Sequence, residues 1–144
     1  MEIKIARIRD DVELPKYVPE SAACFDLQAA VEVTIEPGQY CPIPSGLVVH
    51  VPPGYLFAIA PRSSAPKHGL SMPHSFGIVD PTYCGPEDEV LILLENRTDK
   101  PVHIEKGQRV AQGFFVAAPH IVWNEVDRSE LAPISRGGFG STGK

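Results

Sequence analysis

The sequence LVVHVPPGYLFAI, residues 47–59, places two short apolar runs on either side of Pro52-Pro53-Gly54. Both runs are rich in β-branched, aromatic and other large apolar residues, which suit a pleated strand, whereas proline and glycine favour tight turns. We therefore expect 47–51 and 55–59 to be two strands joined as a β-hairpin.

The fifteen prolines and twelve glycines of the chain argue against long helices, because an internal proline costs a helix roughly 3 kcal/mol. Short runs of β-type residues lie between them. Further strands are expected at 3–8, 31–35, 76–79, 90–95, 102–104 and 110–116. This succession predicts a single all-β domain, built as a jelly-roll-like antiparallel sandwich or barrel.

Composition narrows the class of protein. The 144 residues are 43% hydrophobic and 22% charged, as in a globular domain. A net charge of −5 argues against a broad basic surface for nucleic acid. The most apolar span, 47–60, is interrupted by prolines and a glycine, so no membrane helix is expected. Three cysteines without CxxC spacing favour reduced thiols and a cytoplasmic location.

The tail from Ser135 reads SRGGFGSTGK. Fixing one residue costs about 1–2 kcal/mol, and glycine costs more. Ordering the whole tail would therefore cost on the order of 10 kcal/mol, which one phenylalanine does not offset. We expect residues 1–134 to form the domain and 135–144 to be a flexible arm that orders when something binds it.

Residues 61–85, PRSSAPKHGLSMPHSFGIVDPTYCG, hold the densest candidate chemistry. Arg62 beside Ser63 and Ser64 suits the binding of a phosphate group. An apolar strand that includes His74 then delivers Asp80 into a turn, where a carboxylate can activate water. In the alternative interpretation, Asp80 is an ordinary turn residue and His74 a surface histidine.

Two further acidic segments need an explanation. Asp26 lies in the apolar stretch 22–27, and a charge in such surroundings needs a partner or a metal. Pro86-Glu87-Asp88-Glu89 is most simply a solvated hairpin tip, with a metal site as the minor alternative. Asp26, Arg62, Asp80, Gln112 and the glycine-rich arm together predict one functional constellation.

Five motifs of this sequence resemble those of one protein family, and they occur in the same order along the chain as in that family. They are AACFDLQAA (22–30), PRSS (61–64), GIVDPTYCG (77–85), KGQRVAQGFF (106–115) and RGGFGSTG (136–143). With these motifs the chain resembles the trimeric dUTP diphosphatase (dUTPase) family over nearly its whole length. The resemblance implies a homotrimer with active sites at subunit interfaces. It also implies Mg²⁺-assisted hydrolysis of dUTP to dUMP and diphosphate, which limits uracil incorporation into DNA and supplies dUMP for dTTP synthesis.

The resemblance also assigns roles to individual residues. Asp80 matches the general base that orients water toward the α-phosphorus, and Asp26 matches the acid that holds Mg²⁺ through water. Phosphate contacts fall to Arg62, Ser63, Ser64, Gln112, Arg136, Ser141 and Thr142. Contacts to the base and sugar fall to His74, Gly77, Ile78, Tyr83, Phe139 and Gly140.

The chain also departs from the family pattern. Thr82 stands where many relatives have a second acid, and His74 stands where some have an asparagine. Two alternatives remain. One is a dCTP deaminase of the same superfamily, which would need a glutamate where this chain has Leu93. The other is a non-catalytic β-module that binds nucleotide.

Overall fold

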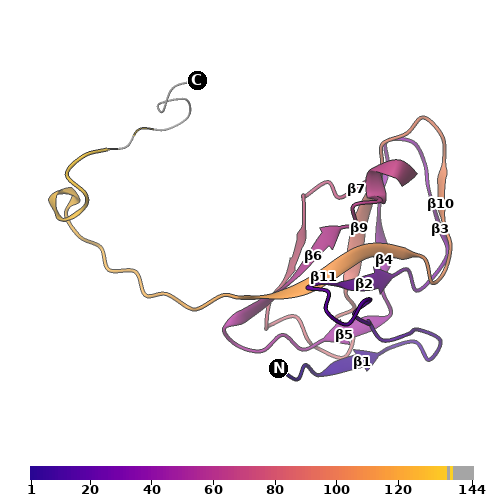
Figure 1. Cartoon of the computed structure of the whole chain (residues 1–144), viewed down its shortest axis with the longest axis horizontal. Helices are drawn as coiled ribbons and strands as arrows, with labels where there is room; N and C mark the ends of the chain where they lie inside the picture. The colour runs from indigo at the N-terminus through magenta and orange to yellow at the C-terminus, as the bar shows by residue number, and fades with distance from the viewer. Residues whose placement is uncertain (136, 138–144) are drawn as a thin grey trace.

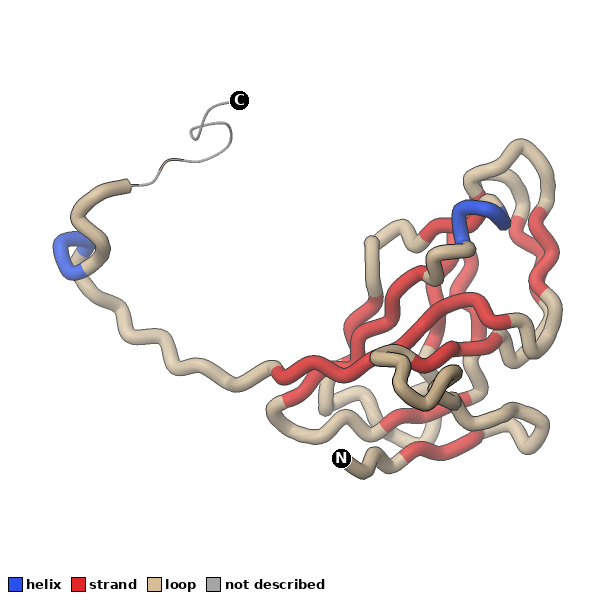
Figure 2. The backbone as a smooth tube through the Cα atoms, viewed as in Figure 1, coloured by secondary structure: helices blue, strands red, loops and turns tan. Residues whose placement is uncertain are grey.

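The computed structural model describes residues 1–135 and 137, and this part of the chain is almost entirely β-structure (Figures 1 and 2). The strands are β1 (Ile5–Arg7), β2 (Phe25–Gln28), β3 (Val33–Ile35), β4 (Tyr40–Pro44), β5 (Leu47–Val49), β6 (Tyr55–Pro61), β7 (Leu70–Ser71), β8 (Gly77–Val79), β9 (Leu91–Asn96), β10 (Val102–Ile104) and β11 (Arg109–Ala117). Two single 3₁₀ turns, η1 (Ala65–His68) and η2 (Arg128–Glu130), are the helical elements of the described part. The all-β expectation is confirmed.

Every strand pairing among the described residues is antiparallel, and these strands form four small sheets. The largest has the order β2-β11-β6-β8, and a second has the order β4-β9-β7. Two pairs, β1-β5 and β3-β10, complete the body. The sheets enclose one apolar core, whose fully buried side chains include Leu27, Ile43, Phe57, Ile92 and Ile104.

The predicted hairpin at 47–59 is wrong. A turn does form, because the Tyr55 amide donates to the Pro52 carbonyl at 3.2 Å. However, β5 pairs with β1, while β6 pairs with β11 and β8. β6 is seven residues long and pairs with β11 over its whole length, whereas β5 is only three residues long. The turn therefore sends the chain from one sheet into another.

Three strands were not predicted, namely β2, β4 and the two-residue β7, and local composition hid the first two. In β2, Phe25 and Leu27 are buried while Asp26 and Gln28 are half-exposed, which is a period-2 pattern inside an apolar stretch. β4 contains Pro42 and Pro44, which argue against a strand in sequence reasoning. β4 lies at the edge of its sheet, where proline is tolerated because one side needs no hydrogen bonds.

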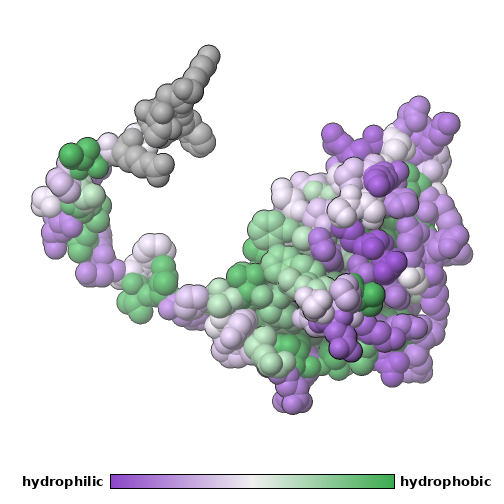
Figure 3. Space-filling view, in the orientation of Figure 1, coloured by the Kyte–Doolittle hydropathy of each residue, from purple (hydrophilic) through white to green (hydrophobic). Residues whose placement is uncertain are grey.

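Beyond β11 the chain leaves the body as an extended tail with one turn, η2 (Figures 1 and 2). Its apolar side chains are largely uncovered: Val122 is 95% exposed and Trp123 is 88% exposed. In the orientation of Figure 3, hydrophobic residues also gather on the body near the root of this tail. The arm expected at 135–144 falls almost wholly outside the described residues.

The three cysteines are free thiols, as expected from their spacing. Among the described residues, no helix has both the length and the apolar character needed to cross a membrane.

Candidate functional site

The first group of predicted residues lies where three neighbouring strands meet. Gln112 of β11 pairs with Asp26 of β2 on one side and with Ala60 of β6 on the other. Arg62 directly follows β6, so it emerges beside the same pair. We call Asp26, Arg62, Ser63, Ser64, Arg109 and Gln112 the arginine cluster.

Asp26 is held by two arginines. Its Oδ1 lies 2.8 Å from the Nε of Arg62, and its Oδ2 lies 3.1 Å from an Nη of Arg109. The side chains of Asp26 and Arg62 are 23% and 26% exposed, whereas that of Arg109 is 52% exposed. The expectation that Asp26 needs a partner is confirmed, and within the described chain this partner is a pair of guanidinium groups.

Arg109 is the residue of this cluster that sequence reasoning missed. The pairing of β11 with β2 shifts between Arg109 and Ala111, which marks a β-bulge, and bulges commonly re-aim a side chain next to a functional site. The signal in the sequence is Val110-Ala111, two consecutive apolar residues that interrupt the alternation and are both buried.

The remaining members of the arginine cluster present polar atoms at its rim. The Nε2 of Gln112 donates to the Pro61 carbonyl at 3.0 Å, which fixes the amide. Ser63 is exposed, and Ser64 is the first residue before η1 but makes no side-chain capping bond there. An Nη of Arg62 reaches Ser64 Oγ at 3.4 Å, close to the limit for a hydrogen bond.

The second group lies in the turn after β8. Asp80 Oδ1 accepts hydrogen bonds from the Thr82 hydroxyl at 2.5 Å and from the Thr82 amide at 2.7 Å. Both bonds lower the pKa of Asp80 below its ordinary value, and the bond from the Thr82 hydroxyl has the larger effect. The carboxylate is therefore ionised at neutral pH. Its Oδ2 has no hydrogen-bond partner among the described residues. Thr82 was noted in the sequence only as a departure from the family pattern.

Tyr83 is fixed at the other side of this turn. Its hydroxyl donates to the Glu89 carbonyl at 3.0 Å, and its amide donates to the Asp80 carbonyl at 3.2 Å. Tyr83 as a whole remains 40% exposed. A short open hollow of about 300 Å³ is lined by Asp80, Tyr83 and residues of β8 and β9.

β8 itself is the edge strand of the largest sheet, so one side of its backbone has no strand partner in the described chain. Gly77 and Ile78 lie on this edge, and Ile78 is 60% exposed. His74, predicted on the strand, lies instead in the turn before β8, because the strand begins only at Gly77. We call residues 77–83 the β8 segment.

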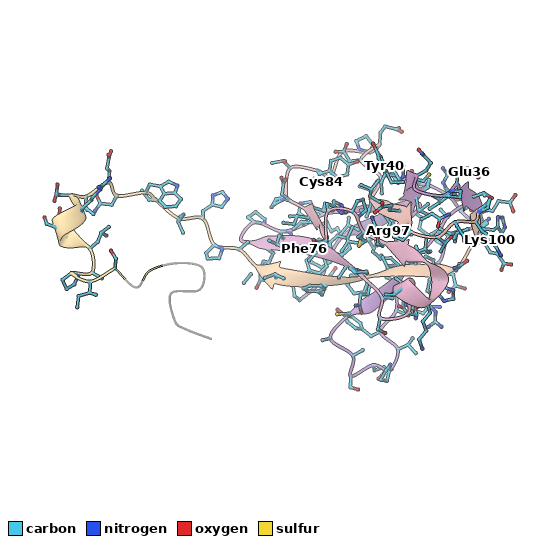
Figure 4. All side chains as sticks on the ribbon, turned by 90° about the horizontal axis from the view of Figure 1, so that it is seen from above. Glu36, Tyr40, Phe76, Cys84, Arg97 and Lys100 are labelled. Atoms are coloured by element: carbon cyan, nitrogen blue, oxygen red, sulfur yellow. The ribbon has the colours of Figure 1, made fainter. Side chains whose placement is uncertain are left out.

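Within one chain, the two groups do not meet. Because Phe57 pairs with Val79 in antiparallel register, Asp80 lies level with Leu56 of β6. Arg62 lies six residues after Leu56, which corresponds to about 20 Å along the strand at roughly 3.3 Å per residue. Figure 4 shows Phe76 and Cys84, which flank the β8 segment, toward the tail end of the body, whereas Glu36 and Lys100 lie at the opposite end.

The acidic tip at 86–89 has a structural role. Asp88 Oδ2 accepts from the Gly85 amide at 2.6 Å, and Glu89 Oε1 accepts from the Gly46 amide at 2.6 Å. Across the described residues, no group of three or more His, Cys, Asp or Glu side chains could hold a metal ion. Five predicted site residues lie outside the described part of the chain: Arg136, Phe139, Gly140, Ser141 and Thr142.

Comparison with known proteins identifies the family. The sequence model of the dUTPase family matches residues 10–143. The deoxyuridine 5'-triphosphate nucleotidohydrolase of Rickettsia prowazekii is 37% identical over 99% of this chain and 97% of its own length. A solved dUTPase from Streptococcus mutans superposes with a TM-score of 0.77 at 30% identity, over 83% of this chain and 98% of its own. A Staphylococcus bacteriophage 80alpha dUTPase solved with dUPNHPP shares the fold, with a TM-score of 0.86 at 21% identity over 99% of both chains. The chain belongs to the dUTPase family.

Proposed function

We propose that the protein hydrolyses dUTP to dUMP and diphosphate, and that Asp80 is the base that activates the attacking water. The observation that carries this proposal is the state of Asp80. It is ionised, fixed through one oxygen by Thr82, and has its second oxygen unbonded among the described residues. A carboxylate held in this way can accept a proton from a water molecule placed in line with the α-phosphorus.

General-base assistance of this kind contributes typically about 10²–10⁴-fold to the rate. The rest of the acceleration has to come from positioning and from neutralising the phosphate charge. The arginine cluster suits the second task, because Arg62 offers a planar fork of donors. We assign the α/β-phosphate contact to Ser63 and Ser64, and the β-phosphate contact to Gln112.

We infer that each active site is shared between subunits of a homotrimer. Groups that act on neighbouring phosphates have to lie within hydrogen-bond reach of them, and a separation of about 20 Å along β6 prevents this within one chain. A second copy can supply the missing half. Apolar side chains around the β8 segment support such packing: Phe76 is 51% exposed and Leu91 is 47% exposed, and exposed apolar groups of this kind mark interaction surfaces.

We propose that Mg²⁺ arrives on the triphosphate and neutralises part of its charge. Both oxygens of Asp26 are engaged by arginines, and the described residues offer no cluster of three ligating side chains. The residues therefore fit a contact from Asp26 to a metal-bound water rather than a complete protein cage. This matches the usual behaviour of Mg²⁺, which keeps several waters and binds few carboxylates.

Selectivity for the base follows from the free edge of β8. Backbone groups of Gly77 and Ile78 can satisfy the donor and acceptor edge of uracil, whereas cytosine would leave buried groups unpaired at about 1–3 kcal/mol each. To the ring of Tyr83, whose hydroxyl is bonded to the Glu89 carbonyl, we assign the exclusion of a 2′-hydroxyl. We also assign His74 to this side of the site.

We propose that residues 135–144 form an arm that closes over the site of another subunit. Arg136, Ser141 and Thr142 would contact the γ-phosphate, and Phe139 and Gly140 would cover the uracil. Deleting residues 136–144 should then leave the assembly intact but reduce hydrolysis strongly. In a cytoplasmic setting, the activity would limit uracil incorporation into DNA and supply dUMP for dTTP synthesis.

Neither alternative is favoured by a specific observation. A dCTP deaminase would need a proton-shuttling side chain at position 93, where half-buried Leu93 of β9 stands. Glu95, two residues later, is already bonded to Ser71 Oγ at 3.1 Å and to Arg97 at 3.0 Å. Asp80, Tyr83 and Gln112, all present in this chain, together argue against a purely binding module.

The test is a nucleotide panel of dUTP, dCTP, dTTP and UTP with Mg²⁺, scored separately for diphosphate and ammonia. The proposal predicts diphosphate from dUTP and no ammonia from dCTP. Asp80→Asn should fold and bind nucleotide but lose most of the turnover. Ammonia from dCTP would instead establish the deaminase, and near-normal kcat in Asp80→Asn would remove Asp80 as the base.

A further inference from the structure

The turn that carries Tyr83 has little packing to hold it. Every residue from 81 to 89 is at least partly exposed, and the chain becomes buried again at Val90. A segment with few buried apolar contacts opens easily unless polar contacts fix it. The shape of this turn, and with it the place of the tyrosine ring, therefore depends on its hydrogen bonds.

Asp88 closes the turn on itself. Its Oδ2 accepts from the Gly85 amide at 2.6 Å, and its own amide donates to the Gly85 carbonyl at 3.1 Å. A bond from an amide to a carboxylate is shorter than a neutral one and roughly twice as strong. A Cβ on residue 85 would lie 3.0 Å from the same Oδ2, so this close approach suits glycine. We call the reciprocal pair of bonds the Asp88 clamp.

Glu89 ties the end of the turn to the core. Its Oε1 accepts from the Gly46 amide at 2.6 Å, and its side chain is only 16% exposed. The next residue, Val90, is buried, and its amide donates to the Leu47 carbonyl at 2.8 Å. Between these two anchors lies the Glu89 carbonyl, which accepts from the Tyr83 hydroxyl at 3.0 Å. The phenol is therefore bonded to an acceptor that is itself held in place.

This bond lies at the candidate site. Tyr83 and Glu89 both line the open hollow of about 300 Å³ beside Asp80. The Tyr83 amide also donates to the Asp80 carbonyl at 3.2 Å. The tyrosine is thus bonded at its backbone to the turn of the candidate base and at its hydroxyl to the far end of the turn 83–89. Loss of the second bond would leave the ring free to change rotamer.

We propose that Asp88 is a positioning residue for the discrimination between deoxyribose and ribose. The Asp88 clamp sets the separation between the two ends of the turn 83–89, and so keeps the Glu89 carbonyl within reach of the Tyr83 hydroxyl. A ring that is held at its hydroxyl resists displacement by a 2′-hydroxyl, whereas a released ring can move aside. The inference rests on the proposed function, because it takes dUTP as the substrate and Tyr83 as the residue beside its sugar.

The test is the ratio of kcat/KM for UTP to that for dUTP. Tyr83→Phe keeps the ring and loses the bond to Glu89, so the ratio should rise about fivefold, the factor that one hydrogen bond commonly represents. Asp88→Ala opens the clamp and should raise the ratio by a similar factor, whereas Asp88→Asn keeps an acceptor oxygen and should raise it less. Glu87→Ala, the matched control at an exposed acidic position of the same turn, should leave the ratio unchanged.

The double variant Tyr83→Phe/Asp88→Ala shows whether the two residues act through one bond. If the clamp acts through the phenol, the double variant should have the ratio of a single variant, because effects on one shared interaction do not add. A wild-type ratio in either single variant would overturn the inference. So would a ratio in the double variant that equals the product of the two single effects.

Thermal unfolding distinguishes this role from a general loss of stability. A residue that only stabilises the turn would lower the Tm and leave the ratio unchanged, and that result for Asp88→Ala would overturn the inference. If Asp88→Ala does not fold, Asp88→Asn takes its place in the same comparison. Absence of diphosphate from dUTP with the wild-type protein would refute the proposed function and the inference with it. Active variants with unchanged ratios would refute the inference alone.

Discussion

Replacing Asp26 tests two separate claims about the arginine cluster. The pair with Arg62 is mostly buried and its N–O distance is 2.8 Å, whereas the pair with Arg109 is at 3.1 Å with a half-exposed arginine. A hydrogen bond to a charged group contributes about 1.5 kcal/mol at the lower end of its range, and an exposed pair adds roughly 0.5 kcal/mol. Asp26→Ala should therefore lower the free energy of unfolding by about 2 kcal/mol.

For a chain of this size, that loss corresponds to a Tm lower by roughly 4–8 °C. Asp26→Asn keeps one neutral acceptor and should lower the Tm by about half as much. Both variants are measured by thermal unfolding at the same protomer concentration, because assembly shifts apparent stability. An unchanged Tm in Asp26→Ala would refute the structural claim that the carboxylate holds the two arginines.

The catalytic claim about Asp26 has its own readout. If the carboxylate holds a metal-bound water, Asp26→Asn needs a higher Mg²⁺ concentration for half-maximal hydrolysis of dUTP at a fixed dUTP concentration. If it serves only to pair the arginines, the Mg²⁺ dependence stays as in the wild type while the Tm still falls. The second result would remove the metal role and leave the ion pairs standing.

Three further predictions follow from single contacts. Thr82→Val removes the 2.5 Å bond that contributes most to the lowered pKa of Asp80. The pKa of Asp80 should therefore rise, and the acid limb of the pH profile of kcat/KM should move to higher pH. In Thr82→Ser, which keeps the hydroxyl, the acid limb should stay close to its wild-type position. Gly113→Ala would place a Cβ 2.6 Å from ring atoms of both Phe25 and Phe57; overpacking should cost about 1–3 kcal/mol, and an unaltered Tm would refute this. Tyr83→Ala should admit UTP, and continued rejection of UTP would place the sugar discrimination elsewhere.

Local patterns were sufficient for much of the fold. The run 102–104 was predicted with the bounds that β10 has, and 110–116 lies within β11. The hairpin at 47–59 failed because strand pairing is decided by distant partners: residues of β6 pair with residues of β11 that lie 50 to 62 positions later in the chain. β4 was missed because the tolerance of Pro42 depends on an edge position that only the assembled sheet defines.

In the site, too, local sequence predicts some features and distant partners decide the others. That Asp26 requires a partner follows from its apolar neighbours, but the identity of Arg109 does not, because 83 residues separate the two. The motifs indicated Asp80 and Arg62 as candidates, and the structure has Asp80 directly after a strand, as the sequence predicted. Their separation in one chain depends on the register between β6 and β8, which no motif encodes.

The central claim is that one active site takes its arginine cluster and its β8 segment from different chains. Its most direct test is co-expression of two inactive variants, Asp80→Asn and Gln112→Ala, followed by assay of the mixed assembly for diphosphate release. Random mixing should restore about a quarter of the sites, because each site needs one intact half from each of two subunits. The matched control replaces Gln112→Ala with a chain that carries both substitutions, and should restore nothing. A mixture as inactive as its two parents would contradict the shared site.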